Sequence, residues 1–130
     1  MKFEPLDPAL NEITGQIVDA AYQVHSNLGP GLMESVYEKC LSVELKEREL
    51  NVQTQVQIPI LYKQYSLDAN LRLDMLVENS VIVELKSVEQ MLPVFEAQLL
   101  TYLRLSGKRL GLLINFNVPL IKKGIKRIVL

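Results

Sequence analysis

The sequence "LRLDMLVENSVIVELK", residues 71–86, decides the fold. Two apolar runs, rich in aliphatic and β-branched residues, flank the polar triplet Glu78, Asn79 and Ser80. Such runs are typical of strands, and Asn tolerates the left-handed backbone conformation that a tight three-residue loop requires. The stretch therefore predicts an antiparallel hairpin whose turn is centred on Asn79.

This loop length determines which residues of the two strands face each other. It predicts three apolar pairs on one face: Val77 with Val81, Met75 with Val83, and Leu73 with Leu85. Because side chains alternate between the two faces of a strand, the other face then brings Asp74 opposite Glu84 and Arg72 opposite Lys86. Two carboxylates are thus expected to meet across a hydrophobic hairpin.

Two like charges directly opposite each other destabilise a sheet unless something compensates for them. A divalent cation would do so, since Mg²⁺ or Mn²⁺ takes oxygen ligands and often uses only one or two carboxylates. Lys86 would then lie beside the metal, where an ammonium can stabilise charge on a phosphate or hold the attacking water. The alternative is a salt-bridge ladder in which Asp74 and Glu84 pair with Arg72 and Lys86. A ladder accounts for the charges but not for their place in so apolar a hairpin.

The residues before the hairpin predict two helices and an edge strand. Apolar residues recur at helical spacing over residues 8–27 and 33–50, and "LGPG" separates the two helices. Apolar and polar residues then alternate in "VQTQVQIPI", residues 52–60, which predicts a half-exposed strand. Pro59 marks this strand as an edge or bulged strand.

The residues after the hairpin predict a helix and two further strands. Pro93 suits the first turn of a helix that Gly107 ends, and this helix is expected to cross over so that a strand within residues 109–117 lies parallel to the one at 81–86. Residues 124–130 are expected to form the last strand. The order ααβββαββ predicts an α/β (α+β) fold, in which a mixed central sheet of about five strands is flanked by helices.

The composition fits one globular domain over residues 1–130. With 48% hydrophobic residues the chain can bury a core, and no apolar run approaches the roughly 20 residues that cross a bilayer. We therefore expect a cytoplasmic protein without a membrane partner. The single cysteine excludes an intrachain disulfide and a cysteine-based zinc site.

The charges are unevenly distributed, although the net charge is only −1. Residues 104–130 contain seven bases and no acids, whereas residues 1–103 carry a net charge of −8. This asymmetry fits a basic surface for phosphates beside an acidic pocket for cations. It fits equally well a set of bases that only solvates a C-terminal hairpin.

Three further residues are candidates for the site, and each also has a simpler explanation. Glu34 opens the second helix, where an acid complements the helix dipole. Gln98 and Tyr102 are four residues apart and share a face of the third helix. Taken alone, they would be a surface glutamine and a core aromatic residue.

Together these residues resemble the PD-(D/E)XK nuclease superfamily and, within it, the small single-domain GxxExxY proteins. The matching residues are Gly31, Glu34 and Tyr37 for GxxExxY, Asp74 with Glu84 and Lys86 for the acid and E-x-K elements, and Gln98 with Tyr102 for a Q-x-x-x-Y helix motif. The resemblance extends from about Val24 to Leu130. Leu73 stands where the superfamily name has proline, a variation that leaves the carboxylate in place.

The resemblance implies a restriction-endonuclease-like core with one metal site. Asp74, Glu84 and the backbone carbonyl of Leu85 would bind Mg²⁺ or Mn²⁺. Glu34 would be a further ligand or would hold a water, and Lys86 would orient the nucleophilic water.

Gln98 and Tyr102 would, by the same resemblance, position the active site or the nucleic-acid backbone. The implied activity is hydrolysis of a phosphodiester by metal-activated water, with nucleic acid as the partner and DNA favoured over RNA. A homodimer would supply two sites for a duplex, an inference from size alone. The alternatives are a nucleic-acid-binding module without turnover and an interaction or oligomerisation domain whose polar cluster is structural.

Overall fold

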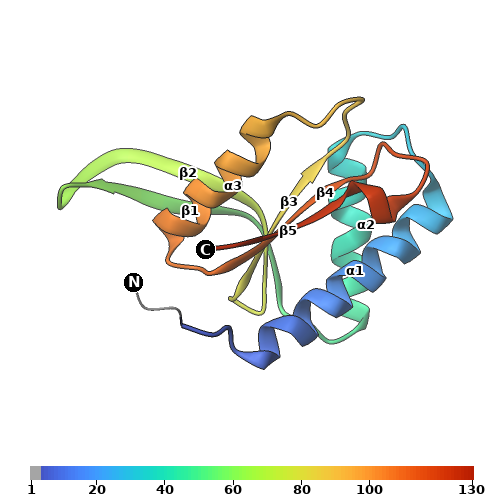
Figure 1. Ribbon diagram of the computed structural model, residues 1–130, viewed down its shortest axis with the longest axis horizontal. Helices are drawn as coiled ribbons and strands as arrows, with labels where there is room; N and C mark the ends of the chain where they lie inside the picture. The colour runs from blue at the N-terminus through green and yellow to red at the C-terminus, as the bar shows by residue number, and fades with distance from the viewer. Residues whose placement is uncertain (1–3) are drawn as a thin grey trace.

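A computed structural model describes residues 4–130 of the chain. The elements follow the predicted order, with one short 3₁₀ helix added before the last strand (Figure 1). They are α1 (Pro8–Leu28), α2 (Glu34–Glu47), β1 (Val52–Tyr62), β2 (Tyr65–Val77), β3 (Val81–Lys86), α3 (Pro93–Ser106), β4 (Leu110–Asn115), η1 (Ile121–Gly124) and β5 (Ile125–Val129).

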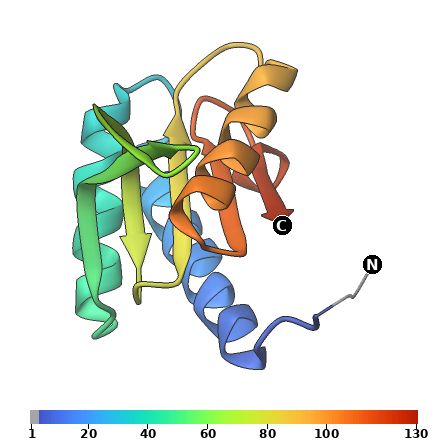
Figure 2. The same ribbon diagram turned by 90° about the vertical axis from the view of Figure 1, so that its left-hand side faces the viewer.

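The five strands form one mixed sheet in the order β1-β2-β3-β4-β5. The β3–β4 pair is parallel and the other three pairs are antiparallel. The helix α3 crosses over between β3 and β4 on one face of the sheet, while α1 and α2 cover the opposite face (Figures 1 and 2). The predicted α/β (α+β) fold and the parallel crossover are thus confirmed.

Local sequence signals determine where the helices begin and end. The Asp7 carboxylate caps α1 by accepting a hydrogen bond from the backbone N–H of Ala9 at 3.0 Å, and Pro8 opens the first turn. Pro93 likewise opens α3. Gly107 ends α3 in the left-handed conformation with φ 75°, which a residue without Cβ adopts without strain.

Buried apolar side chains form one core cluster on each face of the sheet. Met75 and Val77 pack in the cluster under α1 and α2. Leu73 packs instead in the cluster under α3, together with Leu99 and Leu103. The expectation that Leu73 and Met75 share a face is therefore wrong.

The change of face has a structural cause at the residue between them. The predicted hairpin pairs Val77–Val81 and Met75–Val83 are confirmed, but the pairing of β2 with β3 ends there. On the other side of β2, the pairing with β1 skips Gln55, whose φ is 53°. Strand β2 is thus unpaired on both sides at Asp74, and its side-chain alternation shifts by one position at this point.

Strands β1 and β2 continue beyond the rest of the sheet as a two-stranded arm (Figure 1). Residues 61–70 are all exposed, and the arm turns at Lys63 and Gln64, which have φ 48° and 73°. The β1–β2 register shifts between Pro59 and Leu61, so the prediction of a bulged edge strand is confirmed. Within residues 4–130, no helix combines the length and the apolar character that crossing a bilayer requires.

Candidate metal and catalytic site

Asp74 and Glu84 lie together at the point where β2 and β3 separate. The backbone N–H of Asp74 donates to Glu84 Oε2 at 3.2 Å, and the backbone N–H of Leu85 donates to Asp74 Oδ2 at 2.9 Å. Each carboxylate therefore bonds the opposite strand in place of the backbone hydrogen bonds that end at Met75. The split in the hairpin both admits the two acids and holds them in register.

Glu84 is the most strongly perturbed titratable group of the site. It is only 6% exposed, and its Oε1 is buried without a hydrogen-bond partner. Burial raises the pKa of Glu84 from 4.5 to about 9; the nearby Asp74 carboxylate adds to the rise, whereas the Asp74 backbone N–H and Lys86 oppose it. A carboxyl group in this position is neutral at pH 7 unless a cation joins it.

The salt-bridge ladder considered for these charges is absent. The ion pairs within residues 4–130 are Arg48–Asp19 and Lys126–Glu96, so Asp74 and Glu84 form none. The Lys86 ammonium lies instead over the ring of Phe95, with Nζ 4.3 Å from the ring centroid. The acids are thus available to an external cation.

A cavity of about 180 Å³ opens beside Asp74 on the α2 side of the sheet. Its lining residues are Glu34, Ser35, Glu38, Gln55, Arg72, Asp74 and Leu85. Gln55 Nε2 donates to Glu38 Oε1 at 2.8 Å. Gln55, which the β1–β2 pairing skips, therefore connects β1 to α2 at this cavity. At about 30 Å³ for each water of liquid volume, the cavity has room for a hydrated cation.

The spacing of Gly31, Glu34 and Tyr37 has a physical explanation. The buried Tyr37 hydroxyl donates to the Gly29 carbonyl at 2.6 Å and accepts from the Leu32 backbone N–H at 3.1 Å. Gly31, with φ 99°, lets the chain turn sharply between those two contacts. Tyr37 thereby fixes the loop that delivers Glu34 to the first turn of α2.

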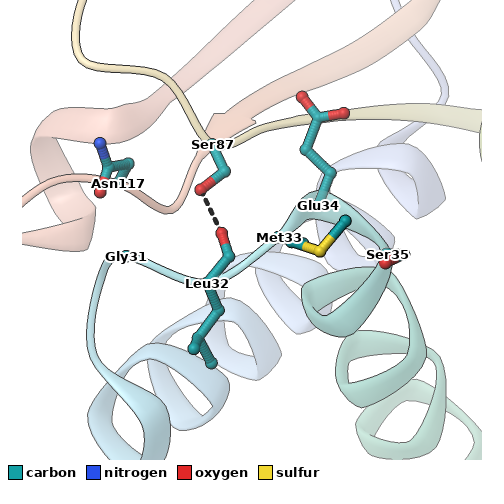
Figure 3. Close-up of a pocket in the computed structure, with 7 residues that line it drawn as sticks. All are labelled: Gly31, Leu32, Met33, Glu34, Ser35, Ser87 and Asn117. Carbon is teal, nitrogen blue, oxygen red and sulfur yellow. Dashed lines mark hydrogen bonds between the residues drawn. The ribbon is translucent and has the colours of Figure 1, made fainter.

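A second, more open cavity of about 500 Å³ adjoins the first and shares Glu34 and Ser35 with it (Figure 3). Ser87 Oγ donates to the Leu32 carbonyl at 2.5 Å across this cavity, which ties the end of β3 to the loop before α2. In Figure 3 the Glu34 carboxylate points away from its helix. Glu34 thus stands between the two cavities.

The predicted metal ligands are only partly brought together. Within residues 4–130, no three His, Cys, Asp or Glu side chains are close enough to hold one metal ion. Asp74, Glu84 and the Leu85 backbone form the close set, and Glu34 lines the cavity that Asp74 and Leu85 also line. Two carboxylates with one unpartnered buried oxygen fit Mg²⁺ or Mn²⁺ that keeps several waters. The role of Glu34 as a further ligand stays a prediction.

The two α3 residues predicted to belong to the site, Gln98 and Tyr102, differ in their exposure. Tyr102 is half-buried, and its pKa is raised by burial and then by the charges of Glu84 and Asp74, which places its hydroxyl within their field. Gln98 is exposed, and its side chain makes no hydrogen bond to another described residue. Its proposed positioning role has no contact to support it in this structure.

Sequence reasoning missed two polar or aromatic residues that shape the site. Asn115 is 2% exposed; its side chain bonds both the N–H and the carbonyl of Val88 and also accepts from Asn117 N–H, so it anchors the chain leaving β3. The sequence does contain a signal for Asn115, because an amide side chain is unusual in a strand as apolar as "LLIN". Nothing in the sequence indicates that Phe95 contacts Lys86, because a phenylalanine at this position of a helix is expected to pack in the core.

Some of the basic C-terminal residues form hydrogen bonds or ion pairs with other residues of the protein. Arg109 bonds the carbonyls of Glu4, Pro5 and Leu130, Arg127 bonds Asn11, and Lys126 pairs with Glu96. For these three residues the contacts favour a structural role over a surface that binds phosphates.

The fold and the acid pair define a class of protein. A mixed five-stranded sheet, helices on both faces and two carboxylates at the split beside its central strand are consistent with a restriction-endonuclease-like domain. A sequence model of the PD-(D/E)XK nuclease superfamily matches residues 11–128, and the chain therefore belongs to that superfamily. Neither the curated proteins nor the solved structures gave a significant match. Membership of the GxxExxY group stays a prediction.

Proposed function

We propose that this protein is a metal-dependent nuclease that hydrolyses phosphodiester bonds of nucleic acid. The observation that carries the proposal is the Asp74–Glu84 pair, in which, among the described residues, a buried carboxylate oxygen has no partner and no ion pair neutralises the acids. Superfamily membership supports it. A catalytic use explains why the fold tolerates a buried acid beside a second carboxylate, since an isolated buried charge is costly.

In this proposal Asp74, Glu84 and the Leu85 carbonyl hold Mg²⁺ or Mn²⁺, and Glu34 holds a water or completes the ligand set. The bound ion would supply an activated water and neutralise charge on the phosphate. The ammonium of Lys86 orients the attacking water.

The remaining parts of the proposal concern the substrate and its setting. Gln98 and Tyr102 position the nucleic-acid backbone. Arg72 lines the cavity beside Asp74, forms no ion pair with a residue of the described range 4–130, and offers a guanidinium to a phosphate. We propose DNA rather than RNA as the substrate, action as a single domain in the cytoplasm, and a homodimer on duplexes.

The test is a cleavage screen over single-stranded, duplex and branched DNA and RNA, with Mg²⁺, Mn²⁺ or EDTA. Glu84→Ala and Asp74→Asn should each lower cleavage at least about 100-fold, since even the loss of a residue that only hydrogen-bonds a metal ligand costs about 10- to 100-fold. Glu89→Ala, a change of an exposed acid, is the matched control. Cleavage that survives Glu84→Ala, or no cleavage of any substrate, would count against the proposal.

A nucleic-acid-binding module without turnover is the second candidate. It is favoured by the acid set, because no third carboxylate joins Asp74 and Glu84 within residues 4–130. In that case binding is salt-sensitive, no substrate is cut, and Asp74→Asn leaves the affinity unchanged.

A further inference from the structure

Lys86 and Phe95 form a contact that joins the two sides of the site. Lys86 ends β3, and Phe95 lies in the first turn of α3. The Lys86 Nζ is 4.3 Å from the centroid of the Phe95 ring, within the distance at which a ring face attracts a cation. Phe95 is half-buried against the core cluster under α3, so the protein packing holds the ring in place.

The Lys86 ammonium does not pair with either acid of the site, although an ionised carboxylate would attract it. Glu84 precedes Lys86 by two residues and shares its face of β3, yet neither Glu84 nor Asp74 pairs with it within 4.0 Å. A carboxylate attracts an ammonium more strongly than an aromatic ring does when both are in reach. The ring contact therefore holds Lys86 beside the acids without an ion pair to either of them.

We propose that Phe95 is a positioning residue whose ring face holds the Lys86 ammonium next to the Asp74–Glu84 pair and off it. The carboxylates stay free for a cation, and the ammonium hydrogens stay free for water or phosphate. The catalytic part of this inference rests on the proposed nuclease function; the holding of Lys86 does not.

Removing the ring has a definite consequence. In Phe95→Leu the core contact is largely kept, but the ammonium loses its partner and moves onto the nearest carboxylate. It then competes with the cation, so the affinity for Mn²⁺ should fall about 2- to 30-fold, the range that cation–π contacts span. Phe95→Trp keeps an aromatic face and should keep the affinity.

The position of Lys86 can be measured without any activity. Reductive methylation with ¹³C-formaldehyde labels lysine ammonium groups and preserves their charge. The dimethyl signal of Lys86, assigned by its loss in Lys86→Arg, should be shifted upfield by the Phe95 ring current. The shift should vanish in Phe95→Leu, persist in Phe95→Trp and persist in the control Val94→Ala, whose side chain is 59% exposed. A Lys86 signal at the frequency of exposed lysines in the unsubstituted protein would overturn the inference.

The functional readouts separate this inference from the proposed function. If the protein cuts nucleic acid, Phe95→Leu should lower kcat with little change in KM, and Phe95→Trp should restore it. If nothing is cut, the nuclease proposal fails, while the ring-current shift and the Mn²⁺ titration still decide whether Phe95 holds Lys86. Equal Mn²⁺ affinity in Phe95→Leu and the unsubstituted protein, with folding confirmed by circular dichroism, would refute the inference.

Discussion

Replacing Glu84 with glutamine should stabilise the metal-free protein at neutral pH, although it replaces one of the two acids of the site. The reason is that Glu84 is 6% exposed, has an unpartnered oxygen and lies against Asp74. The fold therefore favours its neutral form. Glutamine is neutral at every pH and nearly isosteric.

The magnitude follows from the pKa of Glu84, which is 4.5 as its ordinary value and about 9 in the folded protein. Below pH 4.5 both the folded and the unfolded chain keep the proton, so this group costs nothing. Between the two values only the folded chain keeps it, and stability falls as the pH rises. At about 1.4 kcal/mol per pH unit, the loss at pH 7.5 is about 4 kcal/mol, and it levels off above pH 9.

The assay is urea unfolding in EDTA at pH 4, 6 and 7.5, with Glu89→Gln as an exposed control. Glu84→Gln should match the unsubstituted protein near pH 4 and exceed its free energy of unfolding by about 4 kcal/mol at pH 7.5. Glu89→Gln should follow the unsubstituted protein throughout. A difference between Glu84→Gln and the unsubstituted protein that does not change with pH would refute the reasoning.

Three further predictions concern the same site and its supports. Binding of Mg²⁺ at pH 7.5 should release about one proton from Glu84, measured by calorimetry in two buffers of different ionisation enthalpy; no release would mean that Glu84 is already ionised. Tyr37→Phe should cost about 1–3 kcal/mol and speed amide exchange at Leu32, because the Leu32 N–H loses its acceptor and the Gly29 carbonyl loses its donor; unchanged exchange would contradict this. Asn115→Ala should cost about 2–4 kcal/mol in urea unfolding, because three backbone groups lose a partner; a cost below 1 kcal/mol would show that water replaces the amide.

Much of the fold could be predicted because its signals are local. Helical periodicity and the residues Pro8, Pro93 and Gly107 gave helix bounds close to those observed. The hairpin register came from the length of one loop, and it is correct as far as Met75. The first helix extends one residue further than expected, and the second is shorter at both ends, since Arg48 already leaves the helical ladder.

The detail of the site could not be predicted because it depends on how separate elements pack against one another rather than on local patterns. The change of face at Asp74 arises where β2 loses its pairing with both β1 and β3, and nothing in the letters around Gln55 signals a left-handed φ there. Lys86 meets Phe95 only because α3 crosses back over the sheet. The meeting of Asp74 and Glu84, by contrast, needed only the hairpin.

This division between the hairpin and α3 affects how such a domain can change over evolutionary time. Both acids of the pair belong to one hairpin and are ten residues apart, whereas Phe95 and Tyr102 belong to a helix on one face of the sheet. Under the proposed function, substitutions at Tyr102 would alter the surroundings of the site without touching either acid, whereas substitutions of Asp74 or Glu84 would remove the cation site itself. Under that function, a descendant that still takes up a cation but no longer cuts would keep both acids and carry its substitutions elsewhere, at Lys86 or on α3.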